Sequence, residues 1–561
     1  MPGVFSNLFN KTLLAVSTFL IVILFTLSTA DWPALYRFAA GQNPPGHWAA
    51  LHVPLRLDDD VMISLRAGYM IEETGKPSFN RSDLAQPSTS YAAPYLFSWL
   101  LHCVDKGLAI YLYALLGLAC VALTMCCLVQ YSKSRVLGVI LAAALCLTTT
   151  HLLYSLKGWD HLFQGLFLTA ATCLSLRKAD RPQTPLVISL LLALGTLFRP
   201  DGVLLALGIL ASLWFSTHRW KVLLSGLIPY LILMAAALAI NYHQFGHLTP
   251  TTARLKLGGG PPLGYILHYI LANGILSYSA LTLFVVLLIL SFGSRIITSN
   301  RQAIPIVFAC VITVGFSLYN SDYFAGARMV WSSTCILAAT FACLESPLSF
   351  PKFEAAQLGK AASSWRSHPT MRLILVLYAA LVATGVMITA IRQRMQEATI
   401  SSRRLETSAV AQQYVIAHWI NANLHPQDGA LGFFYLGVSY DLPSFEIADF
   451  LGKADEAIAT LKAKQGAPGH NKWDLDRTLA KWKPQAIVPP GPIDPNLPET
   501  RENSYRHTPN LLLNSTIVDG FQYCYVPARE FGVVDKWGFF LRDDIAAQHT
   551  NELRCSHADS P

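Results

Sequence analysis

The sequence predicts a polytopic α-helical membrane protein with a soluble α/β domain at its C-terminal end, and three observations lead to this fold class. Of the 561 residues, 53% are hydrophobic and only 14% are charged, whereas soluble globular domains carry about 25% charged residues. Apolar stretches of roughly 17–25 residues, long enough to cross about 30 Å of hydrocarbon, recur through residues 1–391. Residues 392–561 contain charged, proline-rich and aromatic segments and no apolar stretch of that length.

We expect about eleven membrane-spanning helices in residues 1–391. They are placed near 12–30, 108–130, 136–155, 161–176, 184–198, 202–216, 220–240, 264–291, 303–319, 329–345 and 373–391. A polar lead with Lys11 precedes the first span, and no clear small-residue cleavage site follows it. The first span is therefore expected to be a retained helix rather than a removed signal peptide.

The charges of the connections predict the orientation of the spans, because cytoplasmic loops carry an excess of Lys and Arg. If the N-terminus is cytoplasmic, every inner connection is basic, namely 131–135, 177–183, 217–221, 292–302 and 346–372. The outer segments are then 31–107, 156–160, 199–201, 241–263, 320–328 and everything after 391. The net charge of +8 lies largely in these inner anchors, and no basic patch interleaved with stacking aromatic residues indicates a nucleic-acid partner.

Residues 392–561 are long enough to enclose a core of their own. Helical patterning is expected over 402–423 and 453–464, and strands over 430–437 and 484–490. We therefore expect two domains, a transmembrane domain over 1–391 and an outer α/β domain over 392–561. Cys524 and Cys555 lie in this outward part, where an oxidising compartment permits a disulfide, and the sequence leaves open whether they pair.

Unusual polar residues gather in the predicted outer connections, whereas the inner ones hold mostly basic anchors. The candidate site residues are Asp58, Asp59, Asp60 and Arg66 in the first outer connection, Asp160 at the second, Arg199 at the third, His247, Arg254 and Lys256 in the fourth, and Asp322 and Arg328 in the fifth. A passive anchor has no need of such a one-sided collection, so we expect a site at the outer face.

Structural alternatives exist for several of these residues. Arg199-Pro200-Asp201-Gly202 is typical of a tight turn between antiparallel helices. His247 lies four residues after His243, a spacing that suits metal binding but also suits polar caps at a membrane interface. A structural role does not account for the whole triplet Asp58-Asp59-Asp60, because capping a helix N-terminus requires only one acid.

The acid triplet has the chemistry of a general base. A helix that begins near Asp59 places Asp59, Ile63 and Arg66 along one face and Asp60 on the neighbouring stripe. The positive end of the helix dipole keeps a carboxylate ionised and ready to accept a proton. Cations on the same membrane face could hold a phosphate leaving group. A base and a phosphate clamp together indicate group transfer from a phosphorylated lipid.

Four motifs in this order resemble the GT-C superfamily of membrane glycosyltransferases, and most closely its arabinofuranosyltransferase-like branch. They are Asp59-Asp60-Val61-Met62-Ile63-Ser64-Leu65-Arg66, Arg199-Pro200-Asp201-Gly202, Pro250-Thr251-Thr252-Ala253-Arg254-Leu255-Lys256, and Asp322-Tyr323-Phe324 through Arg328. The segment 437–455 is similar to part of the family's outer domain. The chain departs from the family in its third acid, Asp58, and in Thr251, where an Asn is common.

The resemblance implies an inverting transfer from a polyprenyl-phosphate sugar, with D-arabinofuranose as the suggested sugar. Asp59 is expected to be the base, with Asp60 as the second choice, and Arg199, Lys256, Arg328 and Arg254 are expected to contact the donor. The acceptor would be a cell-surface glycan, a lipid or an exported protein, handled at the outer face of a bacterial inner membrane. No cofactor is firmly expected, although some superfamily members bind a divalent cation near such acids.

Two other function classes are weighed against this one. A transporter or flippase for a lipid-linked substrate predicts ionisable residues near the bilayer midplane and inverted repeats, whereas the ionisable residues here cluster at one interface. A non-catalytic scaffold protein leaves three consecutive acids without a purpose. Glycosyl transfer therefore remains the preferred function, with the flippase as its alternative.

Overall fold

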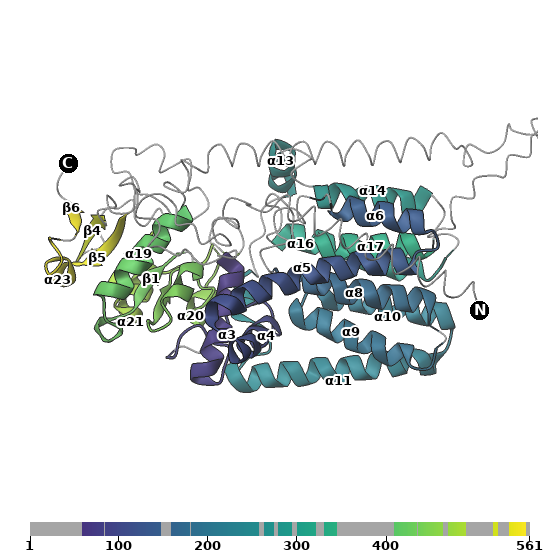
Figure 1. The fold of residues 1–561 in the computed structure, drawn as a ribbon, viewed down its shortest axis with the longest axis horizontal. Coiled ribbons are helices and arrows are strands. Elements are labelled where there is room, and N and C mark those ends of the chain that lie inside the picture. Colours follow the sequence, from purple (N-terminus) through teal and green to yellow (C-terminus); the bar gives the residue numbers. More distant parts are fainter. Residues whose placement is uncertain are drawn as a thin grey trace, which may run out of the picture.

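The computed structural model divides into a bundle of long helices and a smaller domain that contains a β-sheet, with the sheet domain at one end of the bundle (Figure 1). The structure describes residues 59–82, 85–146, 148, 159–179, 181–256, 263–273, 279–293, 300–320, 330–344, 409–434, 436–463, 469, 471–489, 520–525, 538–551 and 553–556. The expected boundary between the two domains, at residues 391 and 392, lies outside these ranges.

The bundle consists of helices that begin close to the predicted spans and mostly end close to them, although α6 ends at Cys146, nine residues before the predicted end at 155. They are α5 (Lys106–Tyr131), α6 (Arg135–Cys146), α8 (Asp160–Arg177), α9 (Thr184–Phe198), α10 (Gly202–Thr217), α11 (Trp220–Phe245), α13 (Leu263–Asn273), α14 (Ser279–Gly293), α16 (Ala303–Asn320) and α17 (Val330–Leu344). The stretch 264–291, expected as one span, contains two helices, so this prediction is wrong. The expected spans 12–30 and 373–391 lie outside the described residues.

Two of the described helices, α5 and α11, are long and apolar enough to cross a bilayer, and the shorter apolar helices include α9, α10 and α17. Only 11% of the apolar window of α11 is buried, and its large side chains Leu231 and Ile232 are exposed. Such a surface is costly in water, which favours lipid around α11. The count of eleven spans stays a prediction.

The connections of the bundle separate into two ends, as the charge pattern predicts. At one end, the Lys133 amide, in a predicted inner connection, donates a 3.0 Å hydrogen bond to the Ala342 carbonyl, which lies in the last turn of α17, just before the predicted inner connection 346–372. At the end that meets the sheet domain, the Thr251 amide donates to the Gln86 carbonyl over 3.1 Å. Thr251 and Gln86 come from two of the predicted outer connections. The structure thus gathers predicted inner and outer connections at opposite ends.

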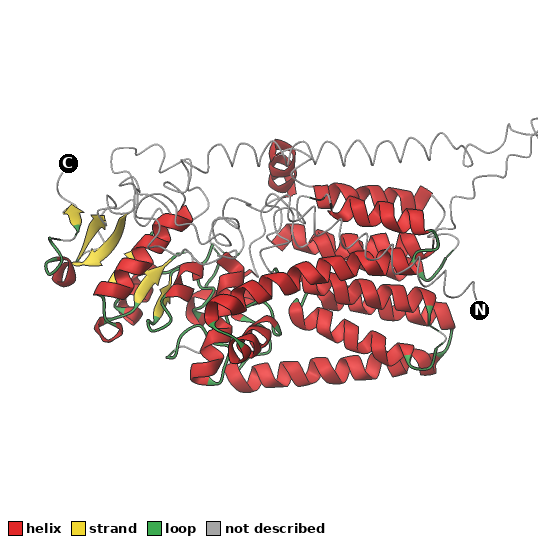
Figure 2. Cartoon of the chain, in the orientation of Figure 1, coloured by secondary structure: helices red, strands yellow, loops and turns green. Residues whose placement is uncertain are grey.

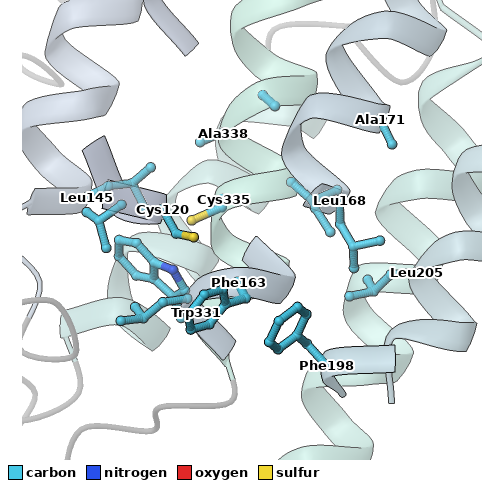
Figure 3. Packing of buried hydrophobic residues seen from close by; sticks show 14 of the residues in the cluster. Cys120, Leu145, Phe163, Leu168, Ala171, Phe198, Leu205, Trp331, Cys335 and Ala338 are labelled. Carbon is cyan, nitrogen blue, oxygen red and sulfur yellow. The ribbon is translucent and has the colours of Figure 1, made fainter. Parts of the chain in front are cut away.

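The core of the bundle is built from interlocking aromatic and small residues (Figure 3). The rings of Phe163 and Phe198 stack with centroids 4.5 Å apart. Trp331 is fully buried, and a Cβ at Gly165 would lie 3.0 Å from its indole nitrogen. Glycine at this position therefore allows α8 to approach α17 closely.

Two helices and a short third one connect the bundle to the sheet domain. Helix α3 (Asp59–Thr74) precedes α4 (Ala93–Cys103), and α12 (Thr251–Lys256) follows α11. Val61, Met62 and Leu65 of α3 belong to the core of the bundle, whereas Ile63 belongs to the core of the sheet domain. Helix α3 is therefore shared by both hydrophobic cores.

The sheet domain is an α/β domain with a six-stranded mixed sheet in the order β2-β1-β3-β5-β4-β6. Figure 2 shows strands of this sheet in yellow beside the helices of the domain. The strands are β1 (Leu431–Phe433), β2 (Ile447–Asp449), β3 (Ala486–Val488), β4 (Phe521–Tyr525), β5 (Gly538–Arg542) and β6 (Arg554–Ser556). Strands β2, β1 and β3 run parallel, and the remaining pairs are antiparallel. Strands β1 and β3 lie within the segments predicted as strands.

The helices of this domain agree in part with the prediction. Helix α19 (Ala409–Asn423) lies within the expected helix 402–423, and α21 (Leu475–Trp482) was not predicted. The helix expected over 453–464 is wrong in length, because only the four-residue α20 (Glu456–Ala459) forms there. The Lys472 ammonium donates a hydrogen bond to the Ala459 carbonyl over 2.9 Å. A tertiary contact therefore occupies the carbonyl of the last residue of this helix.

Cys524 and Cys555 form a disulfide. The two residues are directly paired across β4 and β6, which brings their side chains to the same face of the sheet. The disulfide ties the last described strand to the rest of the sheet.

Candidate active site

The acids Asp59 and Asp60 lie in the first turn of α3, where the bundle meets the sheet domain. The Lys453 ammonium of the sheet domain lies 3.0 Å from Oδ1 of Asp60. The side chain of Lys453 is 11% exposed and that of Asp60 37% exposed, so water reaches the carboxylate. Asp59 occupies the first position of the same helix. The side chain of Asp59 and the residues Asp58, Asp322 and Arg328 lie outside the described part of the chain.

Lys453 is carried by the short loop 450–455, which connects β2 to α20. The fully buried Asp449 carboxylate accepts the Leu451 amide over 2.9 Å and the Ala454 amide over 2.5 Å, which closes the loop on itself. Burial raises the pKa of Asp449 to about 6, although the two backbone hydrogen bonds and the charge of Lys453 oppose this effect. The loop is held in one conformation at the point where it presents Lys453 to Asp60.

The end of the same loop is fixed by Asp455. Its Oδ1 accepts the amides of Ala457 and Ile458 and caps α20, while its other oxygen accepts from Lys481 over 2.9 Å and from Trp482 over 3.2 Å. Burial favours the neutral acid. The hydrogen bond and charge of Lys481, together with the hydrogen bonds from Trp482 and the Ile458 amide, outweigh this effect and lower the pKa of Asp455.

Glu456 of α20 reaches the predicted fourth outer connection. Its carboxylate pairs with both terminal nitrogens of Arg254 and accepts a hydrogen bond from the Thr251 hydroxyl over 3.0 Å. Nε2 of His247 lies 3.4 Å from the same carboxylate. Burial lowers the pKa of His247, and the charge of Arg254 adds to this effect whereas that of Glu456 opposes it. Arg254, a predicted donor contact, therefore binds an internal carboxylate in this structure.

Arg66 holds the sheet domain on α3. It is 1% exposed, and its guanidinium donates to the carbonyls of Phe79, Ser439, Leu442 and Phe445. Burial lowers the pKa of Arg66 to about 9. The structure therefore places this candidate site residue in a structural role, as a bridge between the first outer connection and the segment 436–445.

A second polar cluster lies where α8 begins. The Tyr113 hydroxyl donates to Asp160 over 3.3 Å. One helical turn later, the Gln164 amide donates to the Arg199 carbonyl over 3.3 Å and to Asp201 over 3.0 Å, and Arg199 Nε lies 3.3 Å from Asp201. The turn Arg199-Pro200-Asp201-Gly202 thus forms the predicted tight connection, with an internal ion pair that is almost completely buried.

Lys256, the last predicted donor contact in the described ranges, lies at the end of α12. A Cβ at Gly469 would lie 3.6 Å from Cγ of Lys256, so the lysine side chain packs against the sheet domain. The nearby Lys472 donates to the Arg254 carbonyl over 3.0 Å. Lys256 therefore lies in the same region as Arg254, at the contact between the two domains.

Sequence reasoning did not identify the roles of Lys453, Glu456, Asp449 and Asp455. One signal was present, because this loop follows a strand of a parallel pair, and the carboxyl ends of such strands commonly form binding sites. Among the described residues, no group of three or more His, Cys, Asp and Glu side chains has an arrangement that could hold a metal ion.

Comparisons with known proteins find a distant likeness among solved structures. No family model matches the sequence, and no curated protein matches it. Among solved structures, the chain is similar to the archaeal oligosaccharyltransferase AglB from Archaeoglobus fulgidus, which was solved in complex with an inhibitory peptide and a dolichol-phosphate. The identity is 12%, the TM-score is 0.49, and the match covers 98% of this chain and 75% of AglB. At this level the likeness carries no conclusion about activity, which depends on the site itself.

Proposed function

We propose that this protein is an inverting glycosyltransferase of the GT-C type, which moves a sugar from a polyprenyl-phosphate donor to an acceptor at the outer membrane face. The observation that carries the proposal is the placement of Asp60 at the start of α3, beside Lys453. The same contact zone between the domains includes Arg254 and Lys256. An ionised acid and several cations in one zone are the groups that such a transfer requires.

In the proposed reaction, the carboxylate accepts the proton of the acceptor hydroxyl while that oxygen attacks the anomeric carbon. The bond between the anomeric carbon and the phosphate oxygen breaks, so the configuration inverts and polyprenyl phosphate leaves. Asp59 is proposed as the base and Asp60 as the alternative, because Lys453 already engages one oxygen of Asp60. Arg254, Lys256, Arg199 and Arg328 are proposed to stabilise the charge of the departing phosphate.

The finer assignments follow from the family resemblance. The sugar is proposed to be D-arabinofuranose, and the acceptor a cell-envelope glycan, lipid or exported protein that the sheet domain helps to hold. The site would face the periplasm or exterior of a bacterial cytoplasmic membrane. Mass spectrometry of cell-surface glycans and exported proteins, with and without this chain, would identify both sugar and acceptor.

The direct test uses purified full-length protein with a synthetic polyprenyl-phosphate arabinofuranose and a mixture of envelope acceptors. Asp59→Asn or Asp60→Asn is expected to reduce transfer at least about a hundredfold, the usual contribution of a general base. The matched control is Asp474→Asn, an aspartate that caps α21 in the sheet domain. Full transfer in both site variants would refute the assignment of the base. Movement of the donor across vesicles without any transfer would instead establish the flippase alternative.

A further inference from the structure

Glu456 occupies a set of hydrogen-bond donors that suits a larger anion than a carboxylate. Arg254 offers both terminal nitrogens and Thr251 its hydroxyl, and Nε2 of His247 lies 3.4 Å away. Thr251 is completely buried, and the side chains of His247 and Arg254 are 17% and 24% exposed. A guanidinium, a hydroxyl and an imidazole that converge on one partly buried site are typical of anion recognition.

The guanidinium of Arg254 has one donor that Glu456 does not engage. Within the described ranges, no acceptor contacts the buried Nε of Arg254, although its two terminal nitrogens face Glu456. A buried guanidinium N–H without an acceptor is costly. A carboxylate has two oxygens to offer, whereas a terminal phosphate has three, so a phosphate could also engage the second fork of the guanidinium, Nε with a terminal nitrogen.

We propose that Arg254, Thr251 and His247 form the site for the phosphate of the lipid carrier, and that Glu456 is a built-in anion that fills this site until the carrier displaces it. The inference rests on the proposed function, because it assigns a place to the phosphate of that reaction. Glu456 and a phosphate are both anions and repel each other, so the two do not share the site.

The structure gives Glu456 a short path out of the site. Its side chain is 32% exposed, and it lies on a helix of four residues. Two further contacts hold α20 besides that of Glu456, since Asp455 caps its start and Lys472 donates to its Ala459 carbonyl. Rotation of the Glu456 side chain toward water therefore vacates the site without undocking the sheet domain.

The test measures phosphate binding rather than transfer. Full-length protein in nanodiscs is titrated with farnesyl phosphate, a short prenyl monophosphate, and in parallel with inorganic phosphate. Glu456→Gln removes the competing charge and keeps the size of the side chain, so farnesyl phosphate is expected to bind about tenfold more tightly, as when a competing state is removed. Arg254→Met is expected to abolish this binding. Equal gains for inorganic phosphate would assign the site to free phosphate rather than to the lipid carrier and would overturn that part of the proposal.

The matched control is Glu446→Gln. Glu446 also docks the sheet domain, because its carboxylate accepts from the Arg81 amide and the Ser82 hydroxyl, but it does not bind Arg254 in the structure. It is expected to leave phosphate affinity unchanged. If Glu456 were only a docking contact, its substitution would leave phosphate affinity unchanged or lower it, and either outcome overturns the inference.

A second measurement needs no substitution and covers a failure of the variant to fold. In the wild-type protein, farnesyl phosphate is expected to accelerate hydrogen exchange of the amides of α20, because displacement of Glu456 removes one anchor of that helix. Unchanged or slower exchange on binding would contradict displacement. Tight binding in Glu456→Gln without any glycosyl transfer would refute the proposed function but leave the phosphate site in place.

Discussion

Lys453 and Asp60 lie 393 positions apart in the chain and form an ion pair of 3.0 Å across the contact between the sheet domain and the bundle. The pair brings a cation of one domain to the proposed reaction centre of the other. Because the loop that carries Lys453 is fixed at both ends by buried aspartates, the position of this cation is determined by the fold of the sheet domain.

Lys453→Met is expected to shift the acidic limb of the pH–rate profile to higher pH by about one unit, because a nearby cation favours the ionised form of a carboxylate. Lys453→Arg keeps the positive charge, so its pH–rate profile is expected to stay close to that of the wild type. Transfer rates measured from pH 5 to pH 9 provide the test, with the exposed Lys462→Met as control. A profile identical to the wild type would show that Lys453 does not act on the base.

Arg66→Met is expected to loosen the sheet domain from α3. The substitution leaves the carbonyls of Phe79, Ser439, Leu442 and Phe445 without their shared donor, which should cost about 3–5 kcal/mol as for other broken buried charge contacts. Limited proteolysis within 436–445 and thermal unfolding report the effect. Arg81→Met, a more exposed arginine, serves as the control and should cost less than about 1 kcal/mol. Equal stability of the two variants would contradict the proposed bridge.

The stability of the sheet domain is expected to depend on pH through Asp449. Its pKa is raised from 3.8 to about 6, so the folded state binds the proton more tightly than the unfolded state does. Its favourable contribution is therefore complete below pH 4 and is lost as the pH rises through 6, a change of up to about 3 kcal/mol. The difference in unfolding free energy between wild type and Asp449→Asn should decrease over this range. A difference that stays constant from pH 4 to pH 7 would contradict the shift.

Replacement of both Cys524 and Cys555 by serine is expected to lower the free energy of unfolding of the sheet domain by about 3–4 kcal/mol. The disulfide closes a loop with a sequence separation of 31 residues and restricts the unfolded chain accordingly. Thermal unfolding with and without reductant measures the effect, and reduced wild type should match the double variant. Cys103→Ser, which removes an exposed free thiol, should change nothing in either condition.

Local signals account for what could be predicted from the sequence. Helices α9 and α10 lie within one residue of the predicted 184–198 and 202–216. The first apolar run ends at Arg199-Pro200 and the second begins at Gly202, so each defines a helix without reference to the rest of the chain. The single span expected over 264–291 overlooked Asn273-Gly274, a pair typical of helix ends.

The candidate site depends on contacts between distant residues, which a single sequence does not reveal. Asp60 and Arg254 could be selected because of their residue type and their place in the predicted outer connections. Their partners Lys453 and Glu456 could not, since the separations are 393 and 202 positions. Arg66 illustrates the opposite case, where a charged residue near the acids is used for docking because four backbone carbonyls of the folded protein converge on it.

The position of α3 between two hydrophobic cores has a consequence for the order of assembly during synthesis. Arg66 is made 373 residues before Ser439, one of the residues that it binds, which corresponds to roughly 20–75 s of translation at common rates. During that interval, Ile63 and Phe79 have no sheet to cover them, although the bundle side of α3 can already pack. The nascent chain therefore passes through a stage in which the apolar, positively charged surface formed by Ile63, Arg66 and Phe79 is exposed beside the membrane. A chaperone that binds this surface would act at this stage.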